Sequence, residues 1–248
     1  MDLLVVGAGE IGRWVADTVA ADDAPVDASV AFADREPAVA GDAAADRDAR
    51  TVDADGDSTH DAVCLAVPMS AVPAAVEAYA PRAEEAIVDV SGEMTDALAA
   101  MREHAPDRER ASYHPLFAPP RVPGNVAAVV DEGGPVVEGI SAAIEAGGND
   151  VFETTPAEHD RAMETIQART HSALLAFALA AEDVPDAYGT PIYDELRGLA
   201  DEFLSGTPRV YADIQETFDG AADVAEAAER VAEADPETFE QLYRRARE

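Results

Sequence analysis

Short runs of apolar residues alternate with amphipathic stretches from the start of the chain to residue 152. The apolar runs have the length and continuity of strands covered on both faces, and the stretches between them repeat with the period of a helix. This alternation predicts an α/β fold with a doubly wound parallel sheet of the Rossmann type. The predicted strands are residues 3–6, 28–33, 62–67, 86–90, 110–113, 126–130 and a segment around 151, and the predicted helices are 10–21, 70–79, 95–104 and 135–146.

The remainder of the chain shows only helical patterns, at residues 157–182, 193–204, 210–218 and 221–247. We therefore expect a dinucleotide-binding domain at residues 1–152 and a smaller, all-helical domain at 153–248. Residues 165–181 are more apolar than one helix of so small a domain can keep covered. This excess predicts a homodimer formed through the helical domain.

A glycine-rich turn joins the first predicted strand to the first predicted helix. Gly7, Gly9 and Gly12 form the spacing G-x-G-x-x-G, with Glu10 and Ile11 opening the helix. In this context the first glycine permits a tight turn, the second lets the backbone approach a pyrophosphate, and the third lets helix and strand pack closely. N–H groups in the first helical turn face the anion. The five residues are thus predicted to bind a dinucleotide; the alternative is a glycine-rich turn without a ligand.

Asp34 ends the second predicted strand, 22 residues after Gly12. An acidic residue at about 20 residues accepts hydrogen bonds from the ribose hydroxyls of NAD. A carboxylate there would repel the 2′-phosphate of NADP, so NAD is the expected cofactor. The neighbouring Arg35, which we also assign to the cofactor site, keeps NADP open.

Three further segments end predicted strands, and in open sheets of this type ligands bind beyond the carboxyl ends of the strands. Val67 and Pro68 are therefore expected to border the cofactor, and Ser91 the substrate. His114 is expected to follow the strand at 110–113, held by Pro115, and to act as the catalytic base. Its pKa should then lie near the ordinary histidine value of roughly 6.5. The alternative is a structural histidine in a turn.

One helical stretch carries polar residues at spacings of four, three and four: Asp160, Glu164, Gln167 and His171. On an α-helix these residues share one face, which apolar residues then continue. The stripe predicts either the border of a site, with His171 binding substrate, or a solvated face.

The net charge of the chain indicates which classes of molecule it can bind. The chain has 51 acidic and 17 basic residues and a net charge of -34, and every basic residue is Arg. Such a surplus repels itself in dilute buffer, whereas near 1 M salt the screening length falls to roughly 3 Å. We therefore expect a halophilic, archaeal source. Nucleic acid and anionic membranes are unlikely partners for such a charge, and a small-molecule substrate is expected.

The absence of Lys excludes a P-loop lysine, a Schiff base and a lysine acid or base. Cys64 is the single cysteine, so an intrachain disulfide and a cysteine-rich metal site are excluded, and we expect a buried, inert thiol without any metal centre. No apolar run approaches the 18 residues of a membrane span, and no leader pattern opens the chain. A cytoplasmic protein is expected.

Taken together, these residues resemble the prephenate dehydrogenase family. The resemblance covers nearly the whole chain and implies a nucleotide-binding domain followed by a helical dimerisation domain, with the active site between them. It implies NAD-dependent oxidative decarboxylation of prephenate to 4-hydroxyphenylpyruvate, a step of tyrosine biosynthesis, with His114 hydrogen-bonded to the ring hydroxyl of the substrate. The motifs that carry it are the glycine turn, Asp34-Arg35, Ala66-Val67-Pro68, Asp89-Val90, the segments 113–117 and 158–161, His171, and residues 208–215.

The chain departs from this family at two places. Gly92 and Met94 stand where the family commonly has Ser and Lys, although Ser91 is adjacent. Glu202 stands where the family has an arginine for a substrate carboxylate. A dianionic substrate still needs cations, and the candidates are Arg121, Arg161, Arg197 and Arg209.

Other functions remain open at this stage. Arogenate dehydrogenase performs the same reaction on the amino analogue of the side chain. A different two-domain nicotinamide enzyme, such as an imine reductase, and a regulator that senses NAD without turnover are further alternatives. Any feedback by tyrosine would have to act at the active site.

Overall fold

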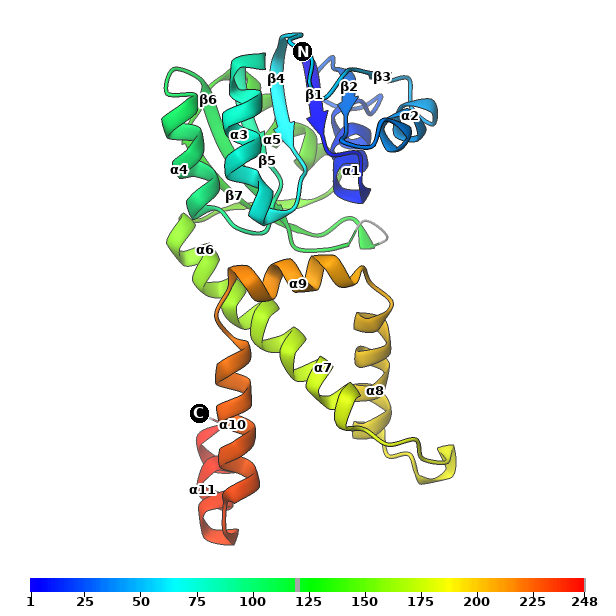
Figure 1. Ribbon diagram of the computed structural model, residues 1–248, viewed down its shortest axis with the longest axis vertical. Helices are drawn as coiled ribbons and strands as arrows, with labels where there is room; N and C mark the ends of the chain where they lie inside the picture. The colour runs from blue at the N-terminus through cyan, green and yellow to red at the C-terminus, as the bar shows by residue number, and fades with distance from the viewer. Residues whose placement is uncertain (119–120, 248) are drawn as a thin grey trace. The chain divides into compact units, whose positions relative to one another are not determined.

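The computed structural model describes residues 1–118 and 121–247, and its first compact unit, Met1–Asp160, is built on one eight-stranded sheet (Figure 1). The strand order is β3-β2-β1-β4-β5-β6-β7-β8. The strands are β1 (Asp2–Val6), β2 (Ser29–Ala33), β3 (Arg50–Thr51), β4 (His60–Leu65), β5 (Ala83–Asp89), β6 (Glu109–Pro115), β7 (Asn125–Glu132) and β8 (Asp150–Glu153). The chain runs outward from β1 in both directions, so the order reverses between β1 and β4, where ligands bind in doubly wound sheets.

Helices cover both faces of this sheet, as the alternating pattern predicts. One apolar cluster joins the sheet to α1, α2 and α5, and a second joins the opposite face to α3 and α4. These helices are α1 (Glu10–Val19), α2 (Pro37–Ala45), α3 (Val72–Tyr79), α4 (Thr95–His104) and α5 (Pro135–Ala146), with short 3-10 turns η1 (Met69–Ala71) and η2 (Ala80–Arg82) before and after α3. The predicted fold class is confirmed.

Two strands, β7 and β8, run opposite to the parallel direction that the alternating pattern predicts. β7 pairs antiparallel with β6, and β8 then pairs parallel with β7. Only nine residues separate β6 from β7, whereas a parallel connection needs a dozen or more residues to cross the sheet. The chain therefore turns back beside β6, and the new ladder extends β6 through Pro115.

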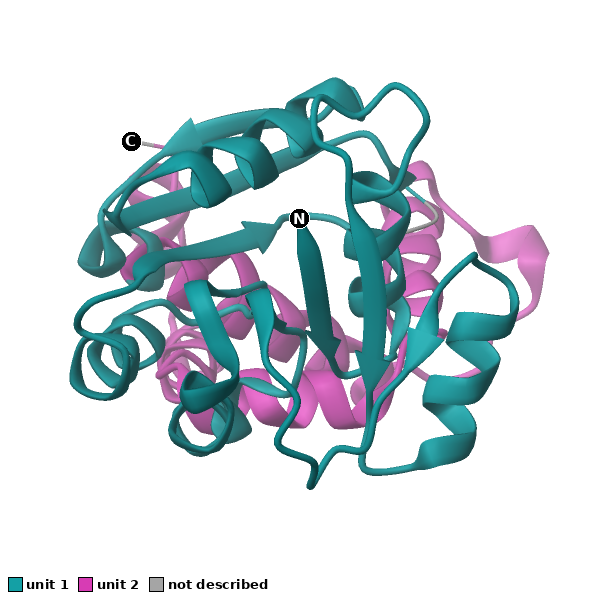
Figure 2. Ribbon diagram, turned by 90° about the horizontal axis from the view of Figure 1, so that it is seen from above, with its two compact units in different colours: residues 1–160 teal, residues 161–248 magenta. Residues whose placement is uncertain are grey.

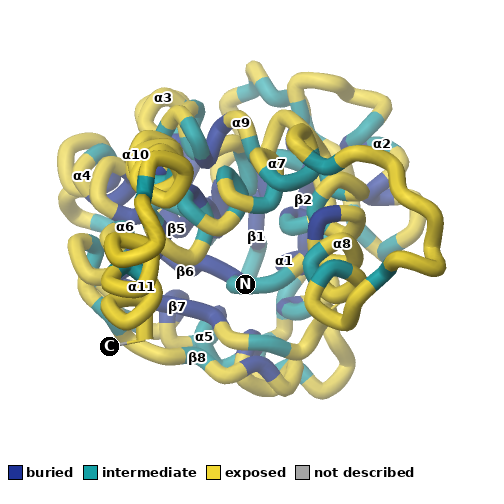
Figure 3. Tube along the Cα trace, turned by 90° about the horizontal axis from the view of Figure 1, so that it is seen from below, coloured by how far each residue is buried: buried dark blue, intermediate teal, exposed yellow. Residues whose placement is uncertain are grey.

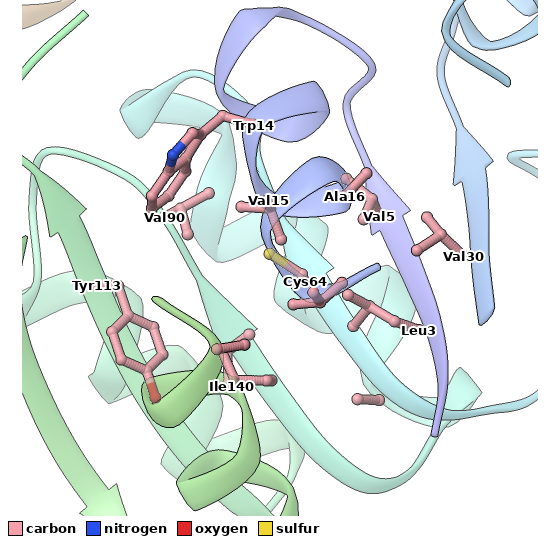
Figure 4. Close-up of a cluster of buried hydrophobic side chains, with 14 of the residues drawn as sticks. Leu3, Val5, Trp14, Val15, Ala16, Val30, Cys64, Val90, Tyr113 and Ile140 are labelled. Atoms are coloured by element: carbon pink, nitrogen blue, oxygen red, sulfur yellow. The ribbon is translucent and has the colours of Figure 1, made fainter. Parts of the chain in front are cut away.

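Close-packed side chains from several strands and helices fill the layer between the sheet and α1 and α5 (Figure 4). Cys64 lies in this layer beside Leu3, Val15 and Ile140, and its burial raises the pKa of the thiol, so it is inert as predicted. Tyr113 is fully buried, and its hydroxyl lies 2.8 Å from the Ser141 hydroxyl. Buried residues of β1, α1 and β6 all belong to this layer, so it supports both the glycine turn and the strand that carries His114.

The second compact unit, Arg161–Glu248, is helical (Figure 2). The predicted helix at 157–182 is continuous but changes its winding: α6 (Pro156–Met163) passes into a π-helical segment, η4 (Glu164–Arg169), and then into α7 (Thr170–Ala180). The remaining helices are η5 (Asp186–Tyr188), α8 (Pro191–Leu204), α9 (Pro208–Thr217), α10 (Ala221–Glu233) and α11 (Pro236–Arg245). The compact units divide within α6, and the domain division after residue 152 stays a prediction.

A single helix over residues 221–247 is not formed. α10 ends before Asp235 and Pro236, and α11 begins there, with the Asp235 carboxylate accepting a hydrogen bond from the Thr238 N–H at 2.8 Å. Proline lacks the N–H and clashes with the preceding turn, so it starts a helix better than it continues one.

Burial is uneven along the chain. Most buried residues lie on the sheet and on the helices packed against it, whereas α7, α10 and α11 have no buried residue (Figure 3). Within the described ranges, no helix combines the length and apolar character needed to cross a membrane.

Candidate active site

The glycine turn has the close backbone contacts that its spacing predicts. Gly7 adopts a φ of 97°, which favours glycine, and its N–H donates to the Ala33 carbonyl at 2.8 Å. A Cβ on Gly7 would overlap the carbonyl of Ala66, which follows β4, and a Cβ on Gly12 would overlap the carbonyl of Gly7. The absence of side chains at these two positions therefore lets α1, β1 and the turn after β4 meet.

The same turn fits the pyrophosphate of a dinucleotide. Gly9 is the N-cap of α1 and is exposed, and a Cβ built on it meets no described atom within 4 Å. Glu10 and Ile11 follow in the first turn of the helix, whose N–H groups have no earlier carbonyl within the helix to accept them. An anion can approach these N–H groups at Gly9 without a side chain in the way.

Asp34 joins the end of β2 to the glycine turn. One carboxylate oxygen accepts the Ala8 N–H and the other the Glu36 N–H, both at 2.9 Å. Arg35 beside it is exposed. The carboxylate therefore holds the backbone of the glycine turn against the end of β2.

β1, β4, β5 and β6 are mutually parallel, so the segments that follow them lie at one edge of the sheet. Val67 is half-buried and Pro68 exposed after β4. Ser91 is buried after β5, where its N–H and hydroxyl both donate to one oxygen of Asp89.

His114 lies within β6 rather than after it, because the antiparallel ladder with β7 continues through Pro115. Its side chain is buried, and its Nδ1 lies 2.9 Å from Nε2 of His159 on α6. The Nδ1 of His159 in turn lies 2.8 Å from a carboxylate oxygen of Asp160. The structure thus links the predicted base to a second histidine and an aspartate, all within the first compact unit.

Burial changes the expected acidity of His114. Loss of solvation, with the nearby His159 as the next cause, lowers the pKa of His114 to about 3. The expectation of a pKa near 6.5 is therefore wrong, because that value belongs to a solvated imidazole. The side chain is an uncharged acceptor throughout the neutral range.

Two further acids near this edge have raised pKa values. Asp89 is fully buried, which raises its pKa to about 6, and its Oδ1 accepts no hydrogen bond from the described residues. Burial, assisted by the charge of Asp160, raises the pKa of Glu93 to about 7. Perturbed acids of this kind cluster at functional sites.

The other predicted substrate-binding residues are divided between the units. Arg121 is exposed in the first unit, and Arg161 and Arg209 are exposed on α6 and at the start of α9. His171 lies on α7 against Phe203 and Tyr211, at ring distances of 5.3 and 4.9 Å.

The polar stripe of the long helix does not keep the predicted α-helical spacing. Glu164 and Gln167 lie in the π-helical segment η4, between Asp160 and His171. A π-helix is wider than an α-helix, so the four residues do not follow one another as the 3.6-residue period requires. Asp160 instead belongs with His159 and His114.

The sequence pattern assigns no role to His159 or Glu93, and it places Asp89 only in a turn that follows a strand. Asp160 was expected on the polar stripe, and His159 stood only within the motif Glu158-His159-Asp160-Arg161. This motif is the sequence feature that could have indicated the hydrogen-bonded pair, because adjacent His and Asp residues in the first turns of a helix can bond to each other.

No protein-family model matches this chain. A 4-amino-4-deoxyprephenate dehydrogenase of Streptomyces pristinaespiralis is 32% identical over 201 residues, which cover 74% of this chain and 68% of the relative. The chain belongs to the prephenate dehydrogenase family. It is therefore an oxidoreductase, as its glycine turn and sheet order indicate.

Solved structures agree on the fold. The prephenate dehydrogenase from Aquifex aeolicus, in complex with hydroxyphenyl propionate and NAD+, superposes with a TM-score of 0.73 at 16% identity and covers 98% of this chain and 95% of its own. The Synechocystis arogenate dehydrogenase has a TM-score of 0.59 at 15% identity and covers 100% of this chain and 98% of its own. Both share their fold with this chain.

Gly92 shows what the departure from the family pattern does locally. A Cβ built on Gly92 would lie 3.5 Å from Nε2 of His114 and 2.8 Å from the sulfur of Met69. Gly92 thus has no side chain of its own beside Nε2 of His114, where prephenate dehydrogenases commonly have serine.

Proposed function

We propose that this protein catalyses the NAD-dependent oxidative decarboxylation of prephenate to 4-hydroxyphenylpyruvate. The observation that carries the proposal is a buried, uncharged His114 at the carboxyl edge of a dinucleotide-binding sheet in a chain of the prephenate dehydrogenase family. Uncharged imidazole is the form that can accept a proton.

The proposed chemistry follows from what His114 can do. As the ring carbon that bears the hydroxyl is oxidised, the hydroxyl loses its proton, and Nε2 of His114 accepts it. Bound NAD supplies the acceptor for the two electrons. Carbon dioxide leaves as the ring becomes aromatic, which drives the reaction forward. Burial of His114 excludes bulk water from the proton transfer.

In this proposal Gly7, Gly9, Glu10, Ile11 and Gly12 hold the pyrophosphate. Asp34, with Arg35 beside it, holds the adenosine ribose, and Val67 and Pro68 border the cofactor. The exposed Gly9 and the close contacts of Gly7 and Gly12 support this assignment.

Cofactor preference tests the role of Asp34. We expect Asp34→Ser to weaken NAD use and improve NADP use, because the change removes the negative charge that repels a 2′-phosphate. Steady-state kcat/KM with each cofactor measures this. The change also removes an acceptor for the Ala8 N–H, so Asp34→Asn, which keeps an oxygen acceptor without the charge, is the matched control. A wild type that prefers NADP would contradict the assignment.

We also propose that Ser91, His171 and arginines bind the substrate, whose two carboxylates need cations. The arginines are Arg121, Arg161 and Arg209. Arg197, whose guanidinium is hydrogen-bonded to Asp201 at 3.1 Å, is the remaining candidate arginine. Bidentate pairing with a carboxylate is the strongest contact that an arginine can supply.

A second candidate substrate is 4-amino-4-deoxyprephenate, which the name of the 32% identical relative specifies. Nε2 of His114, beside Gly92, can accept a proton from the amine of this compound as it can from the hydroxyl of prephenate. Arogenate remains a third candidate. Steady-state assays of the three compounds with NAD and NADP in molar KCl decide among them, and activity with none would contradict the proposed function.

A homodimer formed through the helical unit is a further proposal. Leu175, Leu179, Ile192, Leu199 and Leu204 are exposed on α7 and α8, Leu179 to 79% and Ile192 to 80%. Monomeric proteins seldom expose so many apolar side chains on one small unit. We expect light scattering in molar KCl to give the mass of a dimer at micromolar concentration. A monomer would contradict the proposal.

We finally propose that the protein works in the salt-rich cytoplasm of a halophilic archaeon. The net charge of -34 and the complete absence of Lys support this environment.

A further inference from the structure

His114, His159 and Asp160 form one chain of hydrogen bonds that ends on the backbone of another helix. Asp160 accepts the N–H groups of Met94 and Thr95, each at 3.1 Å, and the hydroxyl of Thr95. Backbone N–H groups can only donate, so Asp160 is held as an acceptor. Burial alone would raise the pKa of Asp160, but the hydrogen bonds from His159, Thr95 and Met94 lower it.

The direction of the chain follows from its ionised end. Nδ1 of His159 lies 2.8 Å from a carboxylate oxygen of Asp160. Because that oxygen is an acceptor, Nδ1 of His159 must carry a proton. In the uncharged ring the other nitrogen of His159, Nε2, then carries a lone pair. This lone pair faces Nδ1 of His114 at 2.9 Å, so Nδ1 of His114 must be the donor.

We propose that His159 and Asp160 are positioning residues that fix the tautomer of His114, with the proton on Nδ1 and the lone pair on Nε2. The proposal rests on the proposed function for its catalytic meaning. Nε2 is the nitrogen beside Gly92, where an added Cβ would lie 3.5 Å away. The opposite tautomer would present an N–H on that side, and His114 could then not accept the substrate proton there.

The charged groups around the two rings agree with this direction. Asp160 faces His159 from α6, Asp89 lies at the end of β5, and Glu93 precedes α4. Asp160 is the one of the three that contacts a ring, and because its pKa is lowered it is ionised and only accepts hydrogen bonds at neutral pH. The two rings themselves meet edge to face, with 5.1 Å between centroids and 75° between planes. This geometry lets an Nδ1–H of His114 point at Nε2 of His159, as the proposed tautomer requires.

The test is a two-bond 1H–15N correlation spectrum of the whole protein, labelled at its five histidines, in molar KCl at neutral pH without substrate. Loss of signals in single His→Gln variants assigns each ring. We expect His114 to carry its proton on Nδ1 and to show an unprotonated Nε2. A protonated Nε2 in the wild type overturns the proposal, and this outcome does not depend on which substrate the enzyme uses.

Two variants of His159 separate a hydrogen-bonding role from a packing role. In His159→Gln the amide can donate to Asp160 and accept from His114, so we expect the tautomer of His114 and most of kcat to be retained. In His159→Phe the ring remains but both hydrogen bonds are lost. We expect a mixed tautomer and a kcat lowered about 10-fold or more, with KM nearly unchanged. If Phe supports the wild-type tautomer and kcat, the role is packing and the proposal fails.

Asp160→Asn tests the end of the chain, and Asp96→Asn is its matched control. Asp96 lies in the first turn of α4, next to Thr95, and its side chain is exposed. Both changes remove one negative charge near α4, but only the first replaces one of the two oxygens that accept from Met94, Thr95 and His159 with an amide NH2 group, which can only donate. We expect the tautomer and kcat to change in Asp160→Asn alone. Equal effects of the two variants would assign the result to charge and overturn the proposal.

Discussion

His114→Asn is expected to lower kcat by about 10² to 10⁴, the usual cost of removing a positioned general base. NAD affinity should be nearly unchanged, because the glycine turn and Asp34 lie on other strands and hold the cofactor independently. Steady-state kinetics and NAD titration measure the two quantities separately.

Burial of His114 also predicts the pH dependence. A base works only when it is unprotonated, so a pKa lowered to about 3 extends activity toward acid. We expect kcat/KM of the wild type to stay near its plateau at about pH 5.5, a full unit below the ordinary histidine pKa. His159 and Asp160 are the charged neighbours that act on the pKa of His114, and the profile near pH 6.5 tests whether the ring titrates as a solvated histidine. An acid limb centred there and absent from His114→Asn would show that His114 is solvated.

His171 provides the comparison for His114. It lies in the helical unit against Phe203 and Tyr211, and burial lowers its pKa as well. If His171 binds substrate, replacing it with Asn should raise KM more than it lowers kcat. Near-normal turnover in His114→Asn would instead place the base elsewhere, and would favour a different dehydrogenase or an NAD-binding regulator.

The second large effect is expected from salt. Seventeen arginines can neutralise at most seventeen of the 51 acidic residues, so a surplus of 34 charges remains. Some of the arginines form ion pairs with carboxylates, as in Arg47–Asp17 and Arg169–Asp223. The remaining carboxylates repel one another over a screening length of about 10 Å at 0.1 M salt and about 3 Å at 1 M. We expect the thermal unfolding midpoint, followed by circular dichroism, to rise steeply between about 0.1 and 2 M KCl.

A charge variant separates screening from other effects of salt. Glu229, Glu233 and Glu237 are exposed on α10 and α11. Replacing all three with Gln removes three negative charges from the surface, so the midpoint should rise at low salt and change little at high salt. A flat salt response of the wild type would remove the argument for a salt-rich cytoplasm.

Local patterns determined much of the first unit. The strand, glycine turn and helix at the start of the chain have the predicted order, and the bounds of α4 (Thr95–His104) and α5 (Pro135–Ala146) agree with the sequence analysis. These features depend on residues close in sequence: apolar periodicity, helix-starting proline and turn glycines act over a few positions. The position of Asp34 at the end of β2 is predictable for the same reason.

Tertiary structure decided the features that depend on distant residues. Pairing of β6 with β7 set the antiparallel strand and placed His114 inside β6, although the apolar run alone ends at Tyr113. The π-helical segment η4 packs against α9 and α10. A search for a 3.6-residue period in the sequence cannot indicate such a segment. The contact between His114 and His159 joins residues 45 positions apart, and burial of that pair moves the pKa of His114. By itself the sequence determined the order of strands and helices in the first unit and supplied the candidate residues of the site. Only the fold decided their hydrogen-bond partners and protonation, because solvation and long-range pairing are properties of the packed chain.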